Sequence, residues 1–488
     1  MKQQVTLYIF LASILALSAN EIPSTKVPQQ ETKQEEVPKE AAKETKPSLL
    51  DGMSFKGFAY MRYMTADGIG GSAQRQQYRL KLDATTAKSK GFSFTAGIFF
   101  NQGSASPSRD THNTDKDIQG SLGVAVGSVF ADRFTIATYY VSKELQTANT
   151  QATINIGRLN LNSVWTDKNL DLGIGVDSKL TSHKLQYQLG YFDTWVTNRI
   201  AYALRSHKAV ANDYKAASLG IGRNLVIFAI KGDDLSGLSF NVSVGNVSGL
   251  LDYLAFSDLK FAHSHFHIRA QVAAAGMNPK PDFGKGAGDT SKLIKWAPGN
   301  INTSNEGFSS TTRPKYTGFN GNTDWANHRG VYNIQIGYKN AGFSSKLGFL
   351  GSFGDGYGVS LDYKGALDVG GKAWVGNLDA ASEGFVFMGN GGRHGTSITS
   401  LYLVLSYAIS KPFKINLDIA HIGGDNNYTI LDVAKAPRQT TAKGITFTEI
   451  TPSLSYKLSD KLNFSVWYAY ATGDMNFGKS RFELRHTF

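Results

Sequence analysis

Residues 462–470 read Leu-Asn-Phe-Ser-Val-Trp-Tyr-Ala-Tyr, and every second residue from Leu462 to Tyr470 is apolar or aromatic. Successive side chains of a strand point to opposite faces, whereas a helix cannot present this set on one face. The same period of two recurs in residues 78–83, 184–191, 332–338 and 413–419. Alternation over about ten residues is what a transmembrane β-strand requires. The sequence therefore predicts strands with one apolar face and one polar face.

The connections between these segments alternate in length. Tight turns are expected at residues 88–91, 340–342, 410–412 and 459–461, and long loops at residues 103–116, 276–329, 355–396 and 424–444. Short turns at one end and long loops at the other are typical of outer-membrane barrels. A soluble propeller or sandwich also uses many short strands, but no repeat of about 40–50 residues is visible. We expect an all-β fold, a transmembrane antiparallel up-and-down β-barrel of about eighteen strands, with sixteen as the alternative.

The first 52 residues differ from the rest of the chain. Residues 1–19 have a basic start, a short apolar core and small residues at Ser18 and Ala19, which is the layout of a signal peptide. Residues 20–52 hold five lysines, seven acids and no aromatic residue. Such a segment cannot bury enough apolar surface to offset its ordering entropy. We therefore expect a signal peptide, then a disordered charged periplasmic tail, and the barrel in residues 53–488.

Composition supports this class of protein. After the signal peptide no apolar run reaches the length of a membrane-spanning helix. The chain has no cysteine, 51 glycines and 51 Tyr and Phe residues in total. An aromatic content of 12% fits the two girdles of a membrane barrel. The composition therefore excludes a helical membrane protein and fits a bacterial outer-membrane location.

The chain ends on an amphipathic segment. Phe482, Leu484 and Phe488 share one face with His486, and polar residues alternate with them. A terminal Phe on such a strand resembles the signal that the barrel-assembly machinery recognises, although His486 departs from the apolar or Tyr residue usual at its position. We expect these three apolar residues to form the membrane-insertion signal.

Several short motifs resemble a known family. Residues 156–167, Ile-Gly-Arg-Leu-Asn-Leu-Asn-Ser-Val-Trp-Thr-Asp, resemble a segment of Campylobacter-type major outer membrane proteins. Residues 190–195, 351–358 and 449–456 are similar to segments of the related Helicobacter outer membrane protein family. The resemblance implies an eighteen-stranded general porin, usually a homotrimer, with an inward-folded loop that narrows the pore. The charged tail and the basic balance depart from the family pattern, so its cation preference is not carried over.

Charge is the main guide to the lumen. The chain has a net charge of +12, and the acid-rich tail makes the part after residue 52 more basic still. Period two places polar residues of the first two strands in the lumen, and rings of like charge set ion selectivity in pores. We expect a basic wall that favours anions, or alternatively ordinary solvated charge far from the narrowest point. The residues concerned are Lys56, Arg62, Arg79, Lys81 and, opposing them, Asp83.

Residues 160–171 are the constriction candidate that the resemblance indicates. Trp165, Thr166, Asp167 and Asp171 could place acids across the lumen from the basic wall and create a transverse field, and Arg158 precedes them. The alternative is a Trp at the membrane interface with acids in a turn, because Trp favours that interface.

Three alternate histidines, His263, His265 and His267, are expected on one strand face together with Arg269. Alternate residues of a strand stand about 6.6 Å apart at Cα, and no acid or cysteine lies close in sequence. We interpret the histidines as lumen-lining side chains, with metal binding or a pH-sensitive gate as the alternatives.

The sequence thus predicts an outer-membrane porin for passive diffusion of ions and small hydrophilic solutes. Barrels of 16–18 strands leave an aqueous channel. The alternative is an adhesin that binds through long extracellular loops, above all residues 276–329. No catalytic motif is visible, so we expect neither an enzyme nor a cofactor. The expected partners are membrane lipid, lipopolysaccharide, the barrel-assembly machinery and two further copies of the chain, with no nucleic acid.

Overall fold

The computed structural model describes residues 52–68, 73–104, 130–167, 171–196, 224–249, 251–278, 326–361, 364–378, 391, 394–425, 429–432, 438–441 and 444–488. The expected signal peptide, nearly all of the expected tail and most of the loop in residues 276–329 lie outside these residues. Residues 50–488 form one compact unit. Among the described residues, no helix has both the length and the apolar character needed to cross a membrane.

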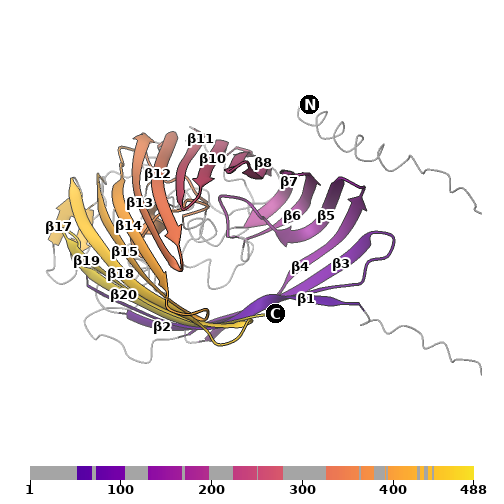
Figure 1. Cartoon of the computed structure of the whole chain (residues 1–488), viewed down its shortest axis with the longest axis horizontal. Helices are drawn as coiled ribbons and strands as arrows, with labels where there is room; N and C mark the ends of the chain where they lie inside the picture. Colours follow the sequence, from indigo (N-terminus) through magenta and orange to yellow (C-terminus); the bar gives the residue numbers. More distant parts are fainter. Residues whose placement is uncertain are drawn as a thin grey trace, which may run out of the picture. The chain divides into compact units, whose positions relative to one another are not determined.

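Eighteen strands form a single antiparallel sheet, so the higher of the two expected strand numbers is confirmed. Each strand pairs with the next along the chain, and β20 pairs with β1 to close the barrel, as the meeting of yellow and indigo ribbons in Figure 1 shows. The short strands β16 (Thr429–Asp432) and β17 (Arg438–Thr441) pair only with each other. The barrel strands are β1 (Ser54–Gly68), β2 (Ala73–Thr85), β3 (Phe92–Ser104), β4 (Phe130–Gln146), β5 (Thr150–Asn160), β6 (Leu172–Ser182), β7 (Leu185–Val196), β8 (Leu225–Leu235), β9 (Leu238–Val247), β10 (Leu251–His263), β11 (Phe266–Met277), β12 (His328–Asn340), β13 (Phe343–Gly354), β14 (Thr399–Ala408), β15 (Phe413–Gly424), β18 (Ile445–Lys457), β19 (Leu462–Gly473) and β20 (Phe477–Thr487).

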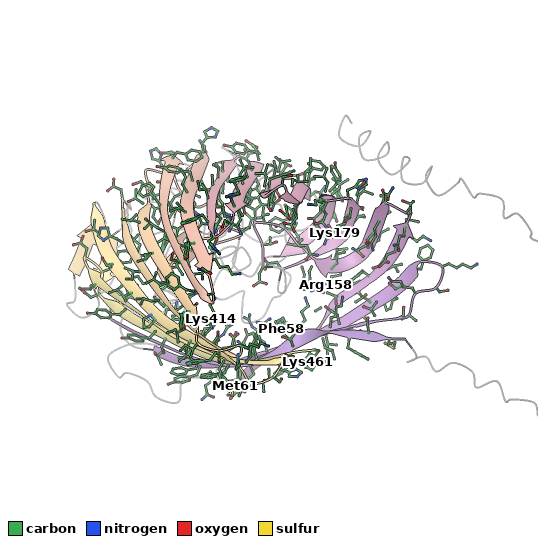
Figure 2. The ribbon with its side chains drawn as sticks, in the orientation of Figure 1. Phe58, Met61, Arg158, Lys179, Lys414 and Lys461 are labelled. Atoms are coloured by element: carbon green, nitrogen blue, oxygen red, sulfur yellow. The ribbon has the colours of Figure 1, made fainter. Side chains whose placement is uncertain are left out.

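The two faces of the wall follow the sequence alternation. On β12, Ile334 is 54% exposed on the outer face, whereas its neighbours Asn333 and Gln335 are almost fully buried inside the barrel. Figure 2 shows Phe58 and Met61 on opposite sides of β1, with Phe58 toward the lumen. Apolar side chains therefore cover the surface that faces lipid, as period two requires.

One end of the barrel has only short turns, and all long connections lie at the other end, as expected. Three connections at that other end, residues 69–72, 248–250 and 474–476, are also short. The turn between β12 and β13 uses Ala341 and Gly342, both with positive φ, and the turn between β8 and β9 uses Ser236 and Gly237 in the same way. Two-residue turns with positive φ match the twist of antiparallel strands. We call this the turn end, and the opposite end the loop end.

The hydrophobic core lies inside the barrel. Two connections from the loop end fold inward. Their described residues are 161–167 and 171 between β5 and β6, and 355–361, 364–378, 391 and 394–398 between β13 and β14. Trp165 and Trp374 of these connections are 1% and 0% exposed, and they belong to one buried cluster with side chains of the wall. The second connection contains the 3-10 helix η3 (Trp374–Leu378). This interior packing positions the polar groups of the lumen.

The expected histidine row is not formed. Residues 264 and 265 are the turn between β10 and β11, so the three histidines are not on one strand. His263 pairs with Phe266, whose side chain is outside, whereas His267 is on the same inward side as Arg269. A turn at this point reverses the chain and ends the alternation on which the prediction rested.

Candidate functional site: the charged lumen

A group of cationic side chains lines the lumen where the barrel closes. β20, β1 and β2 are neighbours, and Arg62 lies opposite Glu483 while Tyr60 lies between Arg485 and Arg79. We call Arg62, Arg79, Lys81, Arg481 and Arg485 the basic wall. It contains Arg62, Arg79 and Lys81, three of the four cations that the sequence predicted for this wall, and adds two arginines of the last strand.

One carboxylate lies among three guanidinium groups of this wall. Glu483, 6% exposed, lies 2.5 Å from Nη2 of Arg62 and 2.7 Å from Nη2 of Arg481. Nη1 of Arg485 lies 3.9 Å away from its other oxygen. A single negative charge offsets only part of this positive charge, so the wall keeps an excess of cations.

Aromatic rings hold the guanidinium groups against the wall. Phe58 and Tyr60 stack with ring centroids 5.8 Å apart. Cζ of Arg485 lies 4.2 Å from the Phe58 centroid, and Cζ of Arg62 lies 4.4 Å from the Tyr60 centroid. Cations over aromatic faces are attracted by the ring quadrupole. The arginines are therefore oriented by the wall as well as charged.

The inward connection of residues 161–171 lies beside the basic wall and not across from it. Lys81 donates from Nζ to Oδ1 of Asn160. Asp167 and Asp171 both interact electrostatically with Lys81, and Asp171 accepts a 2.7 Å bond from the Asp167 N–H. The acids thus serve as partners of the wall, which differs from the expected transverse field. Burial of Trp165 also shows that it is not an interfacial residue.

The other inward connection is fixed to the opposite wall through Asp368. Its carboxylate accepts bonds from Nη1 of Arg269 at 2.5 Å and from Nζ of Lys346 at 2.7 Å, and a 3.0 Å bond from Nε2 of Gln335. Burial by itself raises the pKa of Asp368, but Lys346, Gln335 and Arg269 outweigh burial and hold the pKa well below the usual carboxyl range. Arg269 also pairs with Asp258, so this predicted lumen cation is engaged with acids on two sides.

Two buried acids of the wall hold the next turn of the same connection. Glu449 is 0% exposed and accepts from the backbone N–H groups of Lys372, Ala373 and Trp374 at 2.7–3.2 Å. Asp418 accepts a 3.0 Å bond from the N–H of Gly371, whose φ of +93° favours glycine. Backbone N–H groups at the start of a helix attract negative charge. The wall therefore supplies charged caps to a loop.

The two inward connections also bind each other. Leu361 donates its N–H to the carbonyl of Trp165 at 3.0 Å, and Ala366 donates to the carbonyl of Val164 at 2.7 Å. Together they form one layer inside the barrel, between the basic wall and the strands β10–β18. Sequence reasoning missed Asp368, Asp418 and Glu449. The alternation of β15 and β18 does place Asp418 and Glu449 on the lumen-facing side of their strands.

The remaining predicted residues lie apart from this layer. Lys56 is exposed at the start of β1 and lies opposite Asp83, as the sequence suggested. Asp83 accepts from the hydroxyl of Thr138. Arg158 is half-buried on β5, three strands from β2, so the structure does not bring it to the basic wall. Among the described residues, no group of three potential metal ligands is present.

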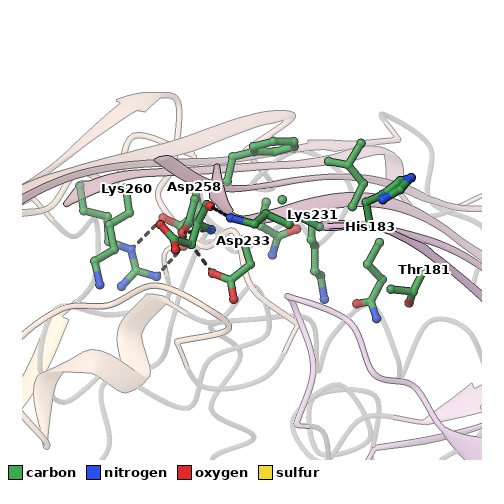
Figure 3. A pocket seen from close by; sticks show the side chains of 15 residues that line it. Thr181, His183, Lys231, Asp233, Asp258 and Lys260 are labelled. Atoms are coloured by element: carbon green, nitrogen blue, oxygen red, sulfur yellow. Dashed lines mark hydrogen bonds and ion pairs between the residues drawn. The ribbon is translucent and has the colours of Figure 1, made fainter. Parts of the chain in front are cut away.

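A cavity of about 730 Å³ opens toward the turn end on strands β6–β11. Figure 3 shows Lys260, Asp258, Asp233 and Lys231 projecting from neighbouring strands to the same side. Its mixed charge and its position make it part of the lumen, beyond the layer formed by the inward connections.

The closed eighteen-stranded antiparallel barrel with a polar lumen defines the class of outer-membrane porin folds. No family model matches the sequence, and no curated protein matches it. Solved structures do share the fold. OccAB4 and OccAB1 of Acinetobacter baumannii each have a TM-score of 0.55 at 11% identity, and the matches cover 89% and 92% of this chain and 98% and 99% of theirs. OccK2 (OpdF) of Pseudomonas aeruginosa, in complex with glucuronate, has a TM-score of 0.51 at 10% identity and covers 90% of this chain and 97% of its own. These likenesses support the porin fold and not the expected kinship with the Campylobacter and Helicobacter proteins.

Proposed function

We propose that this protein is an outer-membrane porin that passes small hydrophilic solutes by diffusion and prefers anions. The basic wall carries the proposal. Five cations on three adjacent strands face the lumen, and the acids beside them are fewer, Glu483 among the guanidinium groups and Asp167 and Asp171 beside Lys81. Rings and rows of like charge set the sign of the permeant ion.

The acids of the opposite side do not cancel this field. Asp368, Asp418 and Glu449 are bound to cations or to backbone N–H groups of the inward connection. The cations Arg269, Lys346, Lys364 and Lys372 lie on the same side as these acids and Asp258, so the charges of this side offset one another. The lumen therefore presents its positive side to solutes.

Small organic carboxylates are the solute class that fits this wall. A guanidinium group offers two parallel N–H donors that match a carboxylate, and the guanidinium groups of Arg62 and Arg485 are held over aromatic rings. OccK2, which shares the fold, binds glucuronate in its solved complex. We propose the same chemical class for this channel.

The test is the reversal potential of single channels in a planar bilayer under a salt gradient. We expect stable steps and a reversal potential with the sign of anion preference. The double variant Arg62→Gln/Arg485→Gln should shift the potential toward cations, because the field of the wall weakens. The control Lys411→Gln/Lys461→Gln loses the same charge at exposed turns and should leave it unchanged. Equal shifts in both variants, or no channel steps from folded protein, would contradict the proposal.

We also propose the export and assembly route that the sequence indicates. Residues 1–19 direct secretion, residues 20–52 form a periplasmic spacer, and the last strand carries the insertion signal. In support, Phe482 and Phe488 are 44% and 41% exposed on the outer face, where an assembly factor can contact them. Phe488→Ser should reduce the yield of heat-modifiable, folded barrel in the outer membrane.

The homotrimer, the contact with lipopolysaccharide and the kinship with Campylobacter and Helicobacter proteins are proposals of the same kind. The trimer and the kinship rest on the short motifs in residues 156–167, 190–195, 351–358 and 449–456, and the lipopolysaccharide contact rests on the basic charge of the chain, part of which we expect on extracellular loops. Cross-linking in native membranes should give a trimer, and a monomer alone would remove that part of the proposal.

A further inference from the structure

Two corners at the turn end combine lysines with outward aromatic rings. We define corner one by Lys88, Lys90 and Lys143 around Phe92. We define corner two by Lys411, Lys457 and Lys461 around the Phe413–Tyr456 ring pair. The first joins the β2–β3 turn to β4, and the second joins the β14–β15 turn to the β18–β19 turn.

In corner one the cationic groups are held beside a ring that faces lipid. Phe92 is 50% exposed, and it lies opposite Lys143 in the ladder. Nζ of Lys143 lies 4.1 Å from the Phe92 centroid and donates a 2.8 Å bond to the carbonyl of Lys90. Nζ of Lys88 pairs with Glu144 at 2.6 Å. Three lysines against one acid leave the corner with an excess of two positive charges.

Corner two has the same charge balance beside an outward ring pair, on the far side of the barrel closure. The rings of Phe413 and Tyr456 meet with centroids 6.1 Å apart, and Tyr456 is 41% exposed. The N–H of Lys457 donates to the carbonyl of Pro412 at 2.9 Å, which ties the two turns together. Lys411, Lys457 and Lys461 are all exposed, with Asp460 as the acid of these turns. The excess is again two positive charges.

Aromatic rings of a membrane barrel lie at the level of the lipid headgroups. Lysines just beyond such rings reach the phosphates of that leaflet with their long side chains. An excess of positive charge there favours a net-anionic headgroup over a zwitterionic one. The turn between β8 and β9 contrasts with the two corners, because Asp233 and Asp234 are exposed there.

We propose that the two corners are binding sites for phospholipids with a net-anionic headgroup, in the leaflet at the turn end. The observation that carries the proposal is an excess of two positive charges beside an exposed ring in two places, with Nζ of Lys143 held over the Phe92 ring in corner one. The inference rests on the membrane barrel and not on the conduction of solutes.

The experiment measures lipid selectivity of the full chain in phosphatidylcholine bilayers with a trace of spin-labelled phosphatidylglycerol or phosphatidylcholine. We expect the motionally restricted fraction to favour phosphatidylglycerol by about fivefold, the effect of roughly one net lysine contact, and to lose this preference at high salt. The variant with Lys88, Lys90 and Lys143 all changed to Gln should lower the preference, and changing corner two as well should abolish it.

Changing the same lysines to Arg is the matched control, because charge and reach are kept, and the preference should remain. Folding of each variant is checked by heat-modifiable migration, and unaltered channel steps separate this result from the porin proposal. Equal association of both lipids with the native chain would overturn the inference, as would a preference that survives in the glutamine variants. If the preference for phosphatidylglycerol appears only after deletion of residues 20–51, the chain's own acidic tail occupies the two corners in the native protein. That result would also overturn the inference.

Discussion

Glu483 and Glu449 are both buried carboxylates on lumen-facing positions, but their partners give them different roles. Glu483 lies among guanidinium groups of the wall itself. Glu449 binds three backbone N–H groups of the inward connection. Removal of a buried acceptor leaves its donors unsatisfied, which costs about 1–3 kcal/mol. The identity of the donor thus decides whether a lumen acid offsets the positive charge of the wall, as Glu483 does, or holds a connection inside the barrel, as Glu449 does.

Glu449→Ala should therefore loosen the connection of residues 355–398. We expect a larger single-channel conductance and faster proteolytic cleavage within this connection, because η3 loses the group that caps its first N–H donors. Ser455→Ala is the control, since Ser455 is on the same strand but at the turn end. Unchanged conductance and unchanged cleavage would show that the other anchors suffice.

Lys364 should make ion selectivity depend on pH. Burial lowers the pKa of Lys364 to about 8, and the nearby cations Lys372 and Lys346 act in the same direction. The charge is present below pH 8 and is lost as the pH rises through 8, so anion preference should fall between pH 7 and 9. Reversal potentials measure this change. The variant Lys364→Met should lack the step, and a step of equal size in that variant would refute the assignment.

The same pKa shift predicts a change in stability. Between about pH 8 and the ordinary lysine pKa of about 10.4 the unfolded chain binds more protons at this position than the folded chain. The Lys364 contribution to the free energy of unfolding therefore increases with pH in that window. Asp368 acts in the opposite range. Its pKa lies below the usual value, so its stabilising contribution is present above about pH 4 and is lost only in stronger acid.

At the scale of elements, the strands can be predicted from local sequence patterns, whereas the conformation of the inward connections depends on contacts with distant residues. Period two and turn residues are local properties, and each of the five segments in which the alternation was recognised corresponds to a barrel strand. The inward connections depend on long-range contacts, such as those of Trp165 with the loop of residues 355–398. Sequence reasoning located residues 160–171 by resemblance but placed residues 355–396 among ordinary long loops. Nothing local distinguishes a loop that turns outward from one whose backbone is capped by acids on distant strands.

Trp165→Ala tests whether the two connections fold as one unit. Large-to-small changes of a buried Trp cost about 3–5 kcal/mol, because a cavity remains. We expect a lower melting temperature by circular dichroism and loss of protease protection in both connections. Leu401→Ala is the control, because Leu401 is 54% exposed on the outer face and borders no interior cavity. Loss of protection in residues 161–171 alone would show that the connections are independent.

At the scale of the whole molecule, closure explains how a lumen wall arises from distant sequence. Arg62 and Glu483 are near opposite ends of the chain and become neighbours only because β20 pairs with β1, whereas Arg481 is two residues from Glu483 on the same strand. The strand alternation predicted that Arg62, Arg79 and Lys81 face the lumen. It did not predict their arginine neighbours of β20 or the stacked rings of Phe58 and Tyr60. The corners at the turn end arise in the same way from turns that are far apart in sequence.

The sequence by itself determined the class of fold, the order of strands and turns, and which face of each strand is apolar, because these depend on side chains at a spacing of two. Only the tertiary structure decided where the histidines of residues 263–267 point, on which side of the lumen Asp167 and Asp171 lie, and which connection fills the barrel. The physical reason for the histidines is that a turn ends the alternation of inward and outward side chains along a strand. The position of a charge in the pore depends on partners that only the closed sheet brings together.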